Sequence, residues 1–256
     1  MMGVIVESGV GGPAEGERWQ VWRPAALKPG GPLLVVCHGA ASHGHYYGAH
    51  PARQRMFLRA ARSGIVVAAG DLGNADPDAG PLDGTWGTPI SVTRASEDMV
   101  TWAGDRWGVD TTRVLVIGDS AGGATALNAL RARPDRIVGC ALRLAVANVT
   151  AAYEMGNPLV TELIDAAHGG DWSAVADERD PARNLEDFAG LGHRVRIYYS
   201  ADDGLVPSST LTAFAEAIGA TAGPIGAVGH DAEVAYPAFP DGDFVAWAWA
   251  RWRAAD

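Results

Sequence analysis

The sequence has little of three features that would each point to a particular class of protein: cysteine, long apolar runs and basic residues. Only two cysteines occur, Cys37 and Cys140, so a disulfide-stapled scaffold is excluded. Both lie in short apolar runs, where a thiol usually acts as a small buried hydrophobic side chain. We therefore expect both cysteines to be structural.

No apolar run approaches the roughly 20 residues that a membrane-spanning helix needs. The first residues, MMGVIVESGVGG, lack the basic start and the long apolar stretch of a Sec-type signal. These absences predict a chain without a membrane span, either cytoplasmic or released without a Sec signal. They are also compatible with a component of a viral particle.

Basic residues are too few for a protein that grips nucleic acid. Twenty lysines and arginines stand against 30 aspartates and glutamates, which gives a formal net charge of −10. That sign opposes binding to a phosphate backbone. We expect no nucleic-acid partner.

What the sequence does contain is the alternation of strands and helices typical of one α/β domain over residues 1–256. With 48% hydrophobic residues and no internal repeat, the chain is long enough to bury one large core. Apolar runs of strand length are Leu33–Cys37, Ile65–Ala69, Val114–Ile117, Ile137–Leu142, Arg194–Tyr199 and Pro224–Val228. Segments with helical spacing are Pro51–Arg62, Ser91–Trp107, Ala121–Arg133, Ser208–Ile218 and Asp241–Arg253. This order predicts a parallel sheet with helices on both faces.

Three segments depart from the repeating unit. Val4–Ser8 and Arg18–Arg23 flank a glycine-rich turn and predict an antiparallel pair at one edge of the sheet. Asp71–Pro89 is a long loop rich in Gly, Pro and Asp, a length that is more often functional than idle. Residues 148–190 are mostly helical where a short crossover would suffice, so we expect a small cap over one end of the sheet.

The most specific motif is Gly118-Asp119-Ser120-Ala121-Gly122-Gly123, which follows the strand RVLVI and precedes a helical segment. A nucleophile at a sharp strand-to-helix turn has a strained backbone, so its flanking residues must be small to let strand and helix approach. The N-terminus of the following helix also favours negative charge near Ser120 during acyl transfer. The pattern predicts a nucleophilic serine.

With this motif the sequence resembles the α/β-hydrolase superfamily, whose nucleophile elbow has the G-x-S-x-G pattern. The likeness extends over nearly the whole chain and implies a twisted, mostly parallel sheet of about eight strands. It also implies that an acid and then a histidine follow the serine. ADDGLVP after the strand RVRIYYS is similar to the family's D-x-L-V-P turn and puts Asp203 in the acid position, with Asp202 as the alternative. Gly229-His230 supplies the histidine, the only one after the acid.

The resemblance further implies an oxyanion hole from two backbone amides. One belongs to Ala121, after the nucleophile, and the other to Ala40 in the turn His38-Gly39-Ala40, where His38 braces the loop. No cofactor is implied. The same strand order separates Cys37 from Cys140 by one strand, about 9 to 10 Å, which is beyond disulfide reach.

Substrate-binding residues are expected near these groups. His43 and Tyr46 follow the oxyanion turn, Asp119 adjoins the nucleophile, and Trp86 lies in the loop TWGTP, either as a pocket wall or as a packing anchor. His43 and His45 could also ligate a metal, but no cysteine or acidic residue lies near them to complete a tetrahedral site. We expect no metal.

These features predict a serine hydrolase that cleaves small carboxylic esters through an acyl-enzyme, with Ser120, His230 and Asp203 as the triad. Thioesterase, lipase and peptidase activities use the same apparatus and stay open as alternatives. A non-catalytic binding protein on a hydrolase scaffold is the alternative from another class.

Overall fold

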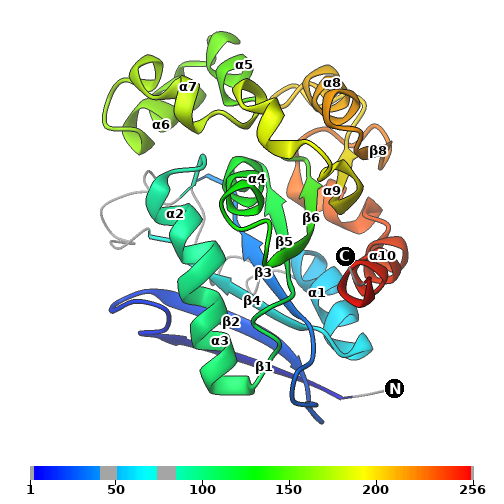
Figure 1. Cartoon of the computed structure of the whole chain (residues 1–256). Helices are drawn as coiled ribbons and strands as arrows, with labels where there is room; N and C mark the ends of the chain where they lie inside the picture. Colours follow the sequence, from blue (N-terminus) through cyan, green and yellow to red (C-terminus); the bar gives the residue numbers. More distant parts are fainter. Residues whose placement is uncertain (1–2, 41–50, 74–84, 255–256) are drawn as a thin grey trace.

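A computed structural model describes residues 3–40, 51–73 and 85–254, and these residues form an eight-stranded sheet. The strand order is β1-β2-β4-β3-β5-β6-β7-β8 (Figure 1). β1 pairs antiparallel with β2, and β2 antiparallel with β4, whereas all other pairs are parallel. The strands are β1 Val4–Val10, β2 Arg18–Pro24, β3 Leu33–Cys37, β4 Val66–Gly70, β5 Val114–Asp119, β6 Ile137–Arg143, β7 Val195–Tyr199 and β8 Thr221–Pro224. The predicted mostly parallel sheet with an antiparallel edge is confirmed.

Helices cover both faces of this sheet, because the central strands are apolar on both sides. Every residue of β3 is buried, and alternate side chains enter two separate cores: Leu33 and Val35 one, Leu34 and Val36 the other. The first core also contains side chains of α3, α4 and α8, the second those of α1 and α10. The helices outside residues 148–190 are α1 Pro51–Ser63, α2 Pro89–Thr93, α3 Met99–Trp107, α4 Gly122–Ala132, α8 Ser208–Ile218, α9 Ala232–Ala238 and α10 Asp241–Arg253.

Residues 148–190 form short helices and single turns. They are α5 Val149–Glu154, α6 Pro158–Ala167 and α7 Ala176–Arg179, with the 3₁₀ turns Trp172–Ala174, Pro181–Arg183 and Leu185–Phe188. Figure 1 shows these helices together at the top of the view, above α2 and α4. We call residues 148–190 the helical segment below.

One sequence prediction in the C-terminal half is wrong, and one predicted helix is present with a different start. The last strand was expected at Pro224–Val228 but β8 ends at Pro224, because Gly226 takes a left-handed conformation (φ +123°) that ends the strand. Helix α9 then follows, although no helix was predicted there. The expected helix Ser91–Trp107 is present. It begins two residues earlier, at Pro89, and contains a π turn at Arg94–Asp98.

The two cysteines confirm the expected strand order. Cys37 lies on β3 and Cys140 on β6, with β5 between them, and both are buried free thiols. Burial raises the pKa of each thiol well above its ordinary value, so neither is poised to react.

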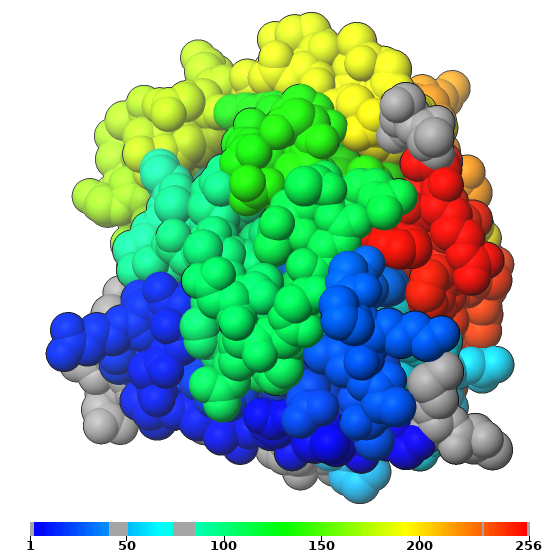
Figure 2. All heavy atoms as spheres, turned by 60° about the horizontal axis from the view of Figure 1, so that its bottom comes forward, coloured from blue at the N-terminus to red at the C-terminus, as the bar shows by residue number. Residues whose placement is uncertain are grey.

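Seen from below, helix α10 lies beside the segment that joins β2 to β3 (Figure 2). Trp249 and Trp252 line a shallow hollow there together with Pro29. Of the helices that the structure describes, none combines the length and the apolar character needed to cross a bilayer.

Candidate active site

Ser120 lies at the turn between β5 and α4 in a left-handed conformation, with φ +50°. A residue with a side chain is strained in this region, so the surroundings must hold it there. Glycine is required on both sides of the turn: a Cβ at Gly118 would overlap the backbone of Gly122, and one at Gly122 would overlap the carbonyl of Cys37. The glycines expected from the motif are therefore the ones that let strand and helix meet.

Backbone hydrogen bonds fix the nucleophile position from three sides. The amide of Ser120 donates to the carbonyl of Arg143 (3.3 Å), and the carbonyl of Ser120 accepts from the amides of Gly123 (3.0 Å) and Val146 (2.8 Å). The strained turn is thus bonded to the end of β6 and to the first turn of α4.

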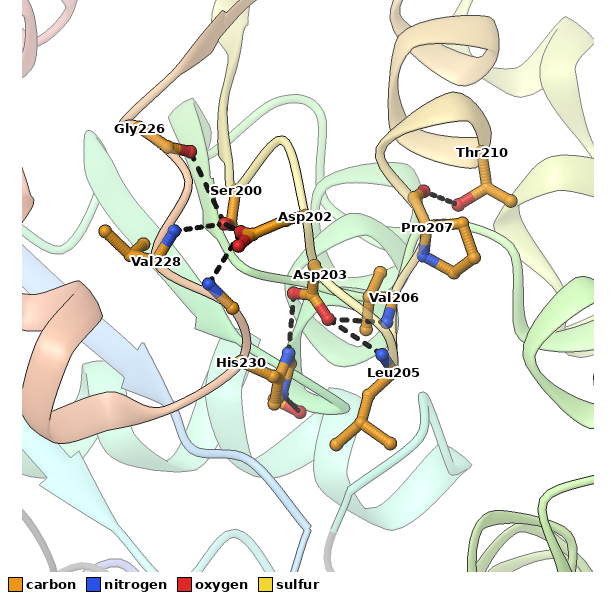
Figure 3. Close-up of polar contacts among 12 residues, drawn as sticks. Ser200, Asp202, Asp203, Leu205, Val206, Pro207, Thr210, Gly226, Val228 and His230 are labelled. Atoms are coloured by element: carbon orange, nitrogen blue, oxygen red, sulfur yellow. Dashed lines mark hydrogen bonds and ion pairs between the residues drawn. The ribbon is translucent and has the colours of Figure 1, made fainter.

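The side chains of Ser120, His230 and Asp203 form one hydrogen-bonded chain. Ser120 Oγ lies 2.9 Å from His230 Nε2, and His230 Nδ1 lies 2.7 Å from Asp203 Oδ2. Asp203 Oδ1 accepts from the amides of Leu205 (2.9 Å) and Val206 (2.8 Å), as Figure 3 shows. The Asp203 side chain is 1% exposed and that of His230 is 18% exposed. A buried carboxylate behind the imidazole and an accessible hydroxyl in front of it are what acyl transfer requires.

The neighbouring carboxylate, Asp202, points elsewhere. Its Oδ1 accepts from Ser200 Oγ (2.7 Å) and from the amide of Gly229 (2.8 Å), whereas Asp203 faces His230 (Figure 3). These bonds lower the pKa of Asp202, the one from Ser200 most. Asp202 therefore ties the loop that carries His230 to the end of β7 and makes no contact with the imidazole itself.

The two amides expected to form the oxyanion hole flank Ser120. Ala121 directly precedes α4, and Ala40 lines the same cavity as Ser120. Within the part of the chain that the structure describes, neither amide has a hydrogen-bond acceptor. His38 lies behind this turn, with its ring nitrogens 2.8 Å from the Gly39 carbonyl and 3.0 Å from the Asp71 carbonyl.

A buried ion pair under the nucleophile was not predicted from the sequence. Arg143 donates to both oxygens of Asp119 at 2.7 Å, and the two side chains are only 1% and 3% exposed. The guanidinium also stacks on the ring of Tyr236, 3.9 Å from its centroid. Asp119, expected to bind substrate, lines the cavity with its charge already paired. In the sequence, the one indication of this ion pair is the arginine that ends the otherwise apolar run IVGCALR.

The cavity in front of Ser120 has a volume of about 290 Å³ and a mainly apolar lining. Trp86, expected here, is one of its walls. The other apolar lining residues are Leu144, Val146, Ala152, Leu159, Val160, Leu163, Leu205 and Val206. Ala152, Leu159, Val160 and Leu163 come from the helical segment, a contribution that sequence patterns did not assign residue by residue.

Two of the expected binding residues, His43 and Tyr46, lie outside the described residues, as does His45. Among residues 3–40, 51–73 and 85–254, no three His, Cys, Asp or Glu side chains are grouped so that they could hold a metal ion.

Comparison with known proteins shows the fold. No family model and no curated protein matches the sequence. Among solved structures, an esterase from Rhizomucor miehei superposes with a TM-score of 0.72 at 16% identity, over 98% of this chain and 85% of that one. Esterase B from Lactobacillus rhamnosis (0.68, 17%, 97% and 84%) and acetyl xylan esterase from Paenibacillus sp. R4 (0.62, 17%, 98% and 89%) are also similar. The chain has the α/β-hydrolase fold.

Proposed function

We propose that this protein is a serine hydrolase that cleaves small carboxylic esters through an acyl-enzyme. The observation that carries the proposal is the hydrogen-bonded chain from Ser120 through His230 to Asp203, which opens onto a cavity with a mainly apolar lining. The names of the similar structures, all esterases, support the same reaction class.

Acylation starts when Ser120 Oγ attacks the ester carbonyl carbon and its proton moves to His230 Nε2. The negative charge on the former carbonyl oxygen is stabilised by the amides of Ala40 and Ala121. When the tetrahedral intermediate collapses, the bond to the alcohol oxygen breaks, and that oxygen takes the proton from Nε2. The acyl group stays on Oγ.

Deacylation follows the same steps with water in place of the Ser120 hydroxyl. His230 Nε2 takes a proton from the water as it attacks the acyl carbon, and the proton then passes to Ser120 Oγ as the carboxylic acid leaves. Asp203 accepts a hydrogen bond from the Nδ1–H of His230 throughout, which fixes the tautomer and stabilises the imidazolium.

The test combines labelling with turnover. A fluorophosphonate probe should modify Ser120 in the wild-type protein and leave Ser120→Ala unlabelled, and p-nitrophenyl esters should be hydrolysed only by the wild type. Substantial turnover by a folded Ser120→Ala variant would overturn the assignment of the nucleophile. Labelling without hydrolysis of any ester would favour a thioester or peptide substrate. If the wild type shows no labelling and no turnover, the result would favour a non-catalytic binding protein.

A further inference from the structure

Trp86 forms its wall of the cavity from a strained turn. Among the described residues, four that are not glycine have a left-handed φ, and three of them line the cavity: Trp86 (+63°), Ser120 and Leu144. Gly87 follows with φ +75°, so two successive residues are left-handed. A tryptophan in this region persists only where its surroundings hold it.

Helix α4 holds the turn from below. The amide of Gly87 donates to Thr125 Oγ1 (3.1 Å), and Asn128 Nδ2 donates to the carbonyls of Gly87 (3.4 Å) and Arg179 (2.8 Å). Gly87 also packs so closely on α4 that a Cβ there would meet Asn128 Nδ2 at 2.5 Å. Asn128 therefore joins the turn to α7 of the helical segment.

His168, at the end of α6, contacts the same turn from above. Its Nδ1 lies 3.1 Å from Arg179 Nη1, and its Nε2 lies 3.2 Å from the carbonyl oxygen of Trp86. A guanidinium only donates, so Nδ1 is the acceptor and Nε2 carries the proton that it donates to Trp86. The residue is 7% exposed, and its ring packs on Trp172 with centroids 4.7 Å apart. His168 is thus a neutral imidazole in one tautomer, and it links the Trp86 turn to the helical segment.

We propose that His168 is a positioning residue that holds the Trp86 turn against α6 and so sets the width of the cavity for the substrate. Trp86 and Leu163, which lies on α6 one turn before its end, both line the cavity. The hydrogen bond from His168 Nε2 to the Trp86 carbonyl fixes the wall formed by Trp86 relative to the wall formed by Leu163. The inference rests on the proposed function, because the cavity is taken to receive the ester.

The kinetic test uses two substitutions whose amide groups reach the positions of different ring nitrogens of His168. In His168→Gln the amide nitrogen reaches about as far as Nε2 and can still donate to the Trp86 carbonyl, whereas His168→Asn reaches only to the place of Nδ1. With p-nitrophenyl hexanoate we expect His168→Asn to raise KM about tenfold with kcat changed less than about twofold. His168→Gln should restore most of the wild-type KM. With p-nitrophenyl acetate, which fills less of the cavity, the KM values of the two variants should differ less.

A second readout does not depend on catalysis. Hydrogen exchange of a peptide covering residues 85–92 should speed up in His168→Asn and stay near the wild-type rate in His168→Gln. Arg179→Met removes the donor that fixes the tautomer and should speed up the same exchange by a smaller factor. This third variant decides the question if His168→Asn does not fold.

Equal KM values and equal exchange in the Asn and Gln variants would overturn the positioning role. So would a loss of kcat that is the same for both esters, because that is the behaviour of a residue needed for the chemistry or for folding alone. If the wild type neither hydrolyses an ester nor reacts with a fluorophosphonate, the proposed function fails, while the exchange comparison still decides whether His168 holds the turn.

Discussion

The two sides of the cavity are held by different kinds of interaction. On the sheet side, β5 and β6 are paired along their length and entirely buried, and they end at Ser120 and at the pair Asp119–Arg143. On the other side, the helical segment contributes no strand. Buried side chains such as Ile164, Trp172 and Phe188 pack it into the first core, and side chains that bond to backbone groups also join it to the body. Asn128 reaches the carbonyl of Arg179, and His168 reaches that of Trp86.

One buried carboxylate closes the helical segment on itself. Asp180, which is fully buried, accepts from the amides of Val149 (3.1 Å) and Thr150 (2.8 Å) at its start and of Ala182 (3.1 Å) near its end. Within this frame Leu159 is 64% exposed although it lines the cavity. Under the proposed function, the sheet side carries the groups that break the ester bond, and the helical side supplies apolar walls for the substrate.

The largest expected effect tests the sheet side through its two adjacent aspartates. Asp203→Asn should lower kcat by about 10³ to 10⁴-fold, because His230 loses the acceptor that fixes its tautomer. Asp202→Asn should lower kcat by at most about tenfold, since Asp202 bonds to Ser200 and Gly229 and lies outside the chain from Ser120 to Asp203. Steady-state kinetics with p-nitrophenyl esters measure both. The reverse order would make Asp202 the acid, and two small effects would place the acid elsewhere.

These two aspartates also show what the sequence could predict. The elbow glycines, the acid turn and the histidine after it are each recognisable because a short stretch of chain must satisfy one local geometry. Asp203 and His230 are 27 residues apart and still meet, as the chain order implied.

The rest depended on contacts that no local pattern encodes. Arg143 meets Asp119 because strand register places the two residues side by side, and His168 meets Trp86 across 82 residues. The last strand was misplaced because the continuous run PIGAV is apolar enough for a strand, whereas the left-handed conformation of Gly226 is a property of the folded chain. Register and tertiary contact, rather than composition, decide these features.

The next effect concerns stability on the sheet side. Arg143→Met should lower the free energy of unfolding by about 3 to 5 kcal/mol, because it leaves the Asp119 carboxylate buried without its cation. Urea denaturation followed by circular dichroism measures the loss. The double variant Asp119→Leu/Arg143→Met, which removes both charges, should lose less than the single variant. Leu159→Ala, on the exposed helical side, should stay within about 0.5 kcal/mol of the wild type. A double variant as unstable as Arg143→Met would mean that packing on Tyr236, and not charge pairing, dominates.

A smaller effect is expected where the helical segment closes on itself. Asp180→Ala should lower stability by about 3 kcal/mol, since one buried and two half-buried amides lose their acceptor. Limited proteolysis should then cut within residues 148–190 before the rest of the chain, as expected of a locally destabilised unit. Ser120 labelling by a fluorophosphonate should persist, because the elbow makes no bond to Asp180. Loss of labelling together with global unfolding would show that the two sides are not independent.

The last effect, of similar size, is a pH dependence that belongs to the helical side alone. Burial, and then the charge of Arg179, lower the pKa of His168 from 6.5 to about 4, while the hydrogen bond to the Trp86 carbonyl and then the charge of Asp165 act in the opposite direction. Above pH 6.5 the His168 imidazole is neutral in both the folded and the unfolded protein, so it adds no pH dependence to the free energy of unfolding. Between pH 6.5 and 4 the unfolded chain binds a proton that the folded chain excludes, so the free energy of unfolding falls as the pH falls, by about 3 kcal/mol at pH 4. His168→Gln has no such group, so the stability difference between the wild type and this variant should shift by that amount in urea denaturation at pH 7 and pH 4. A difference that stays constant over this range would show that His168 takes up its proton in the folded protein, and the neutral imidazole would no longer explain how the turn is held.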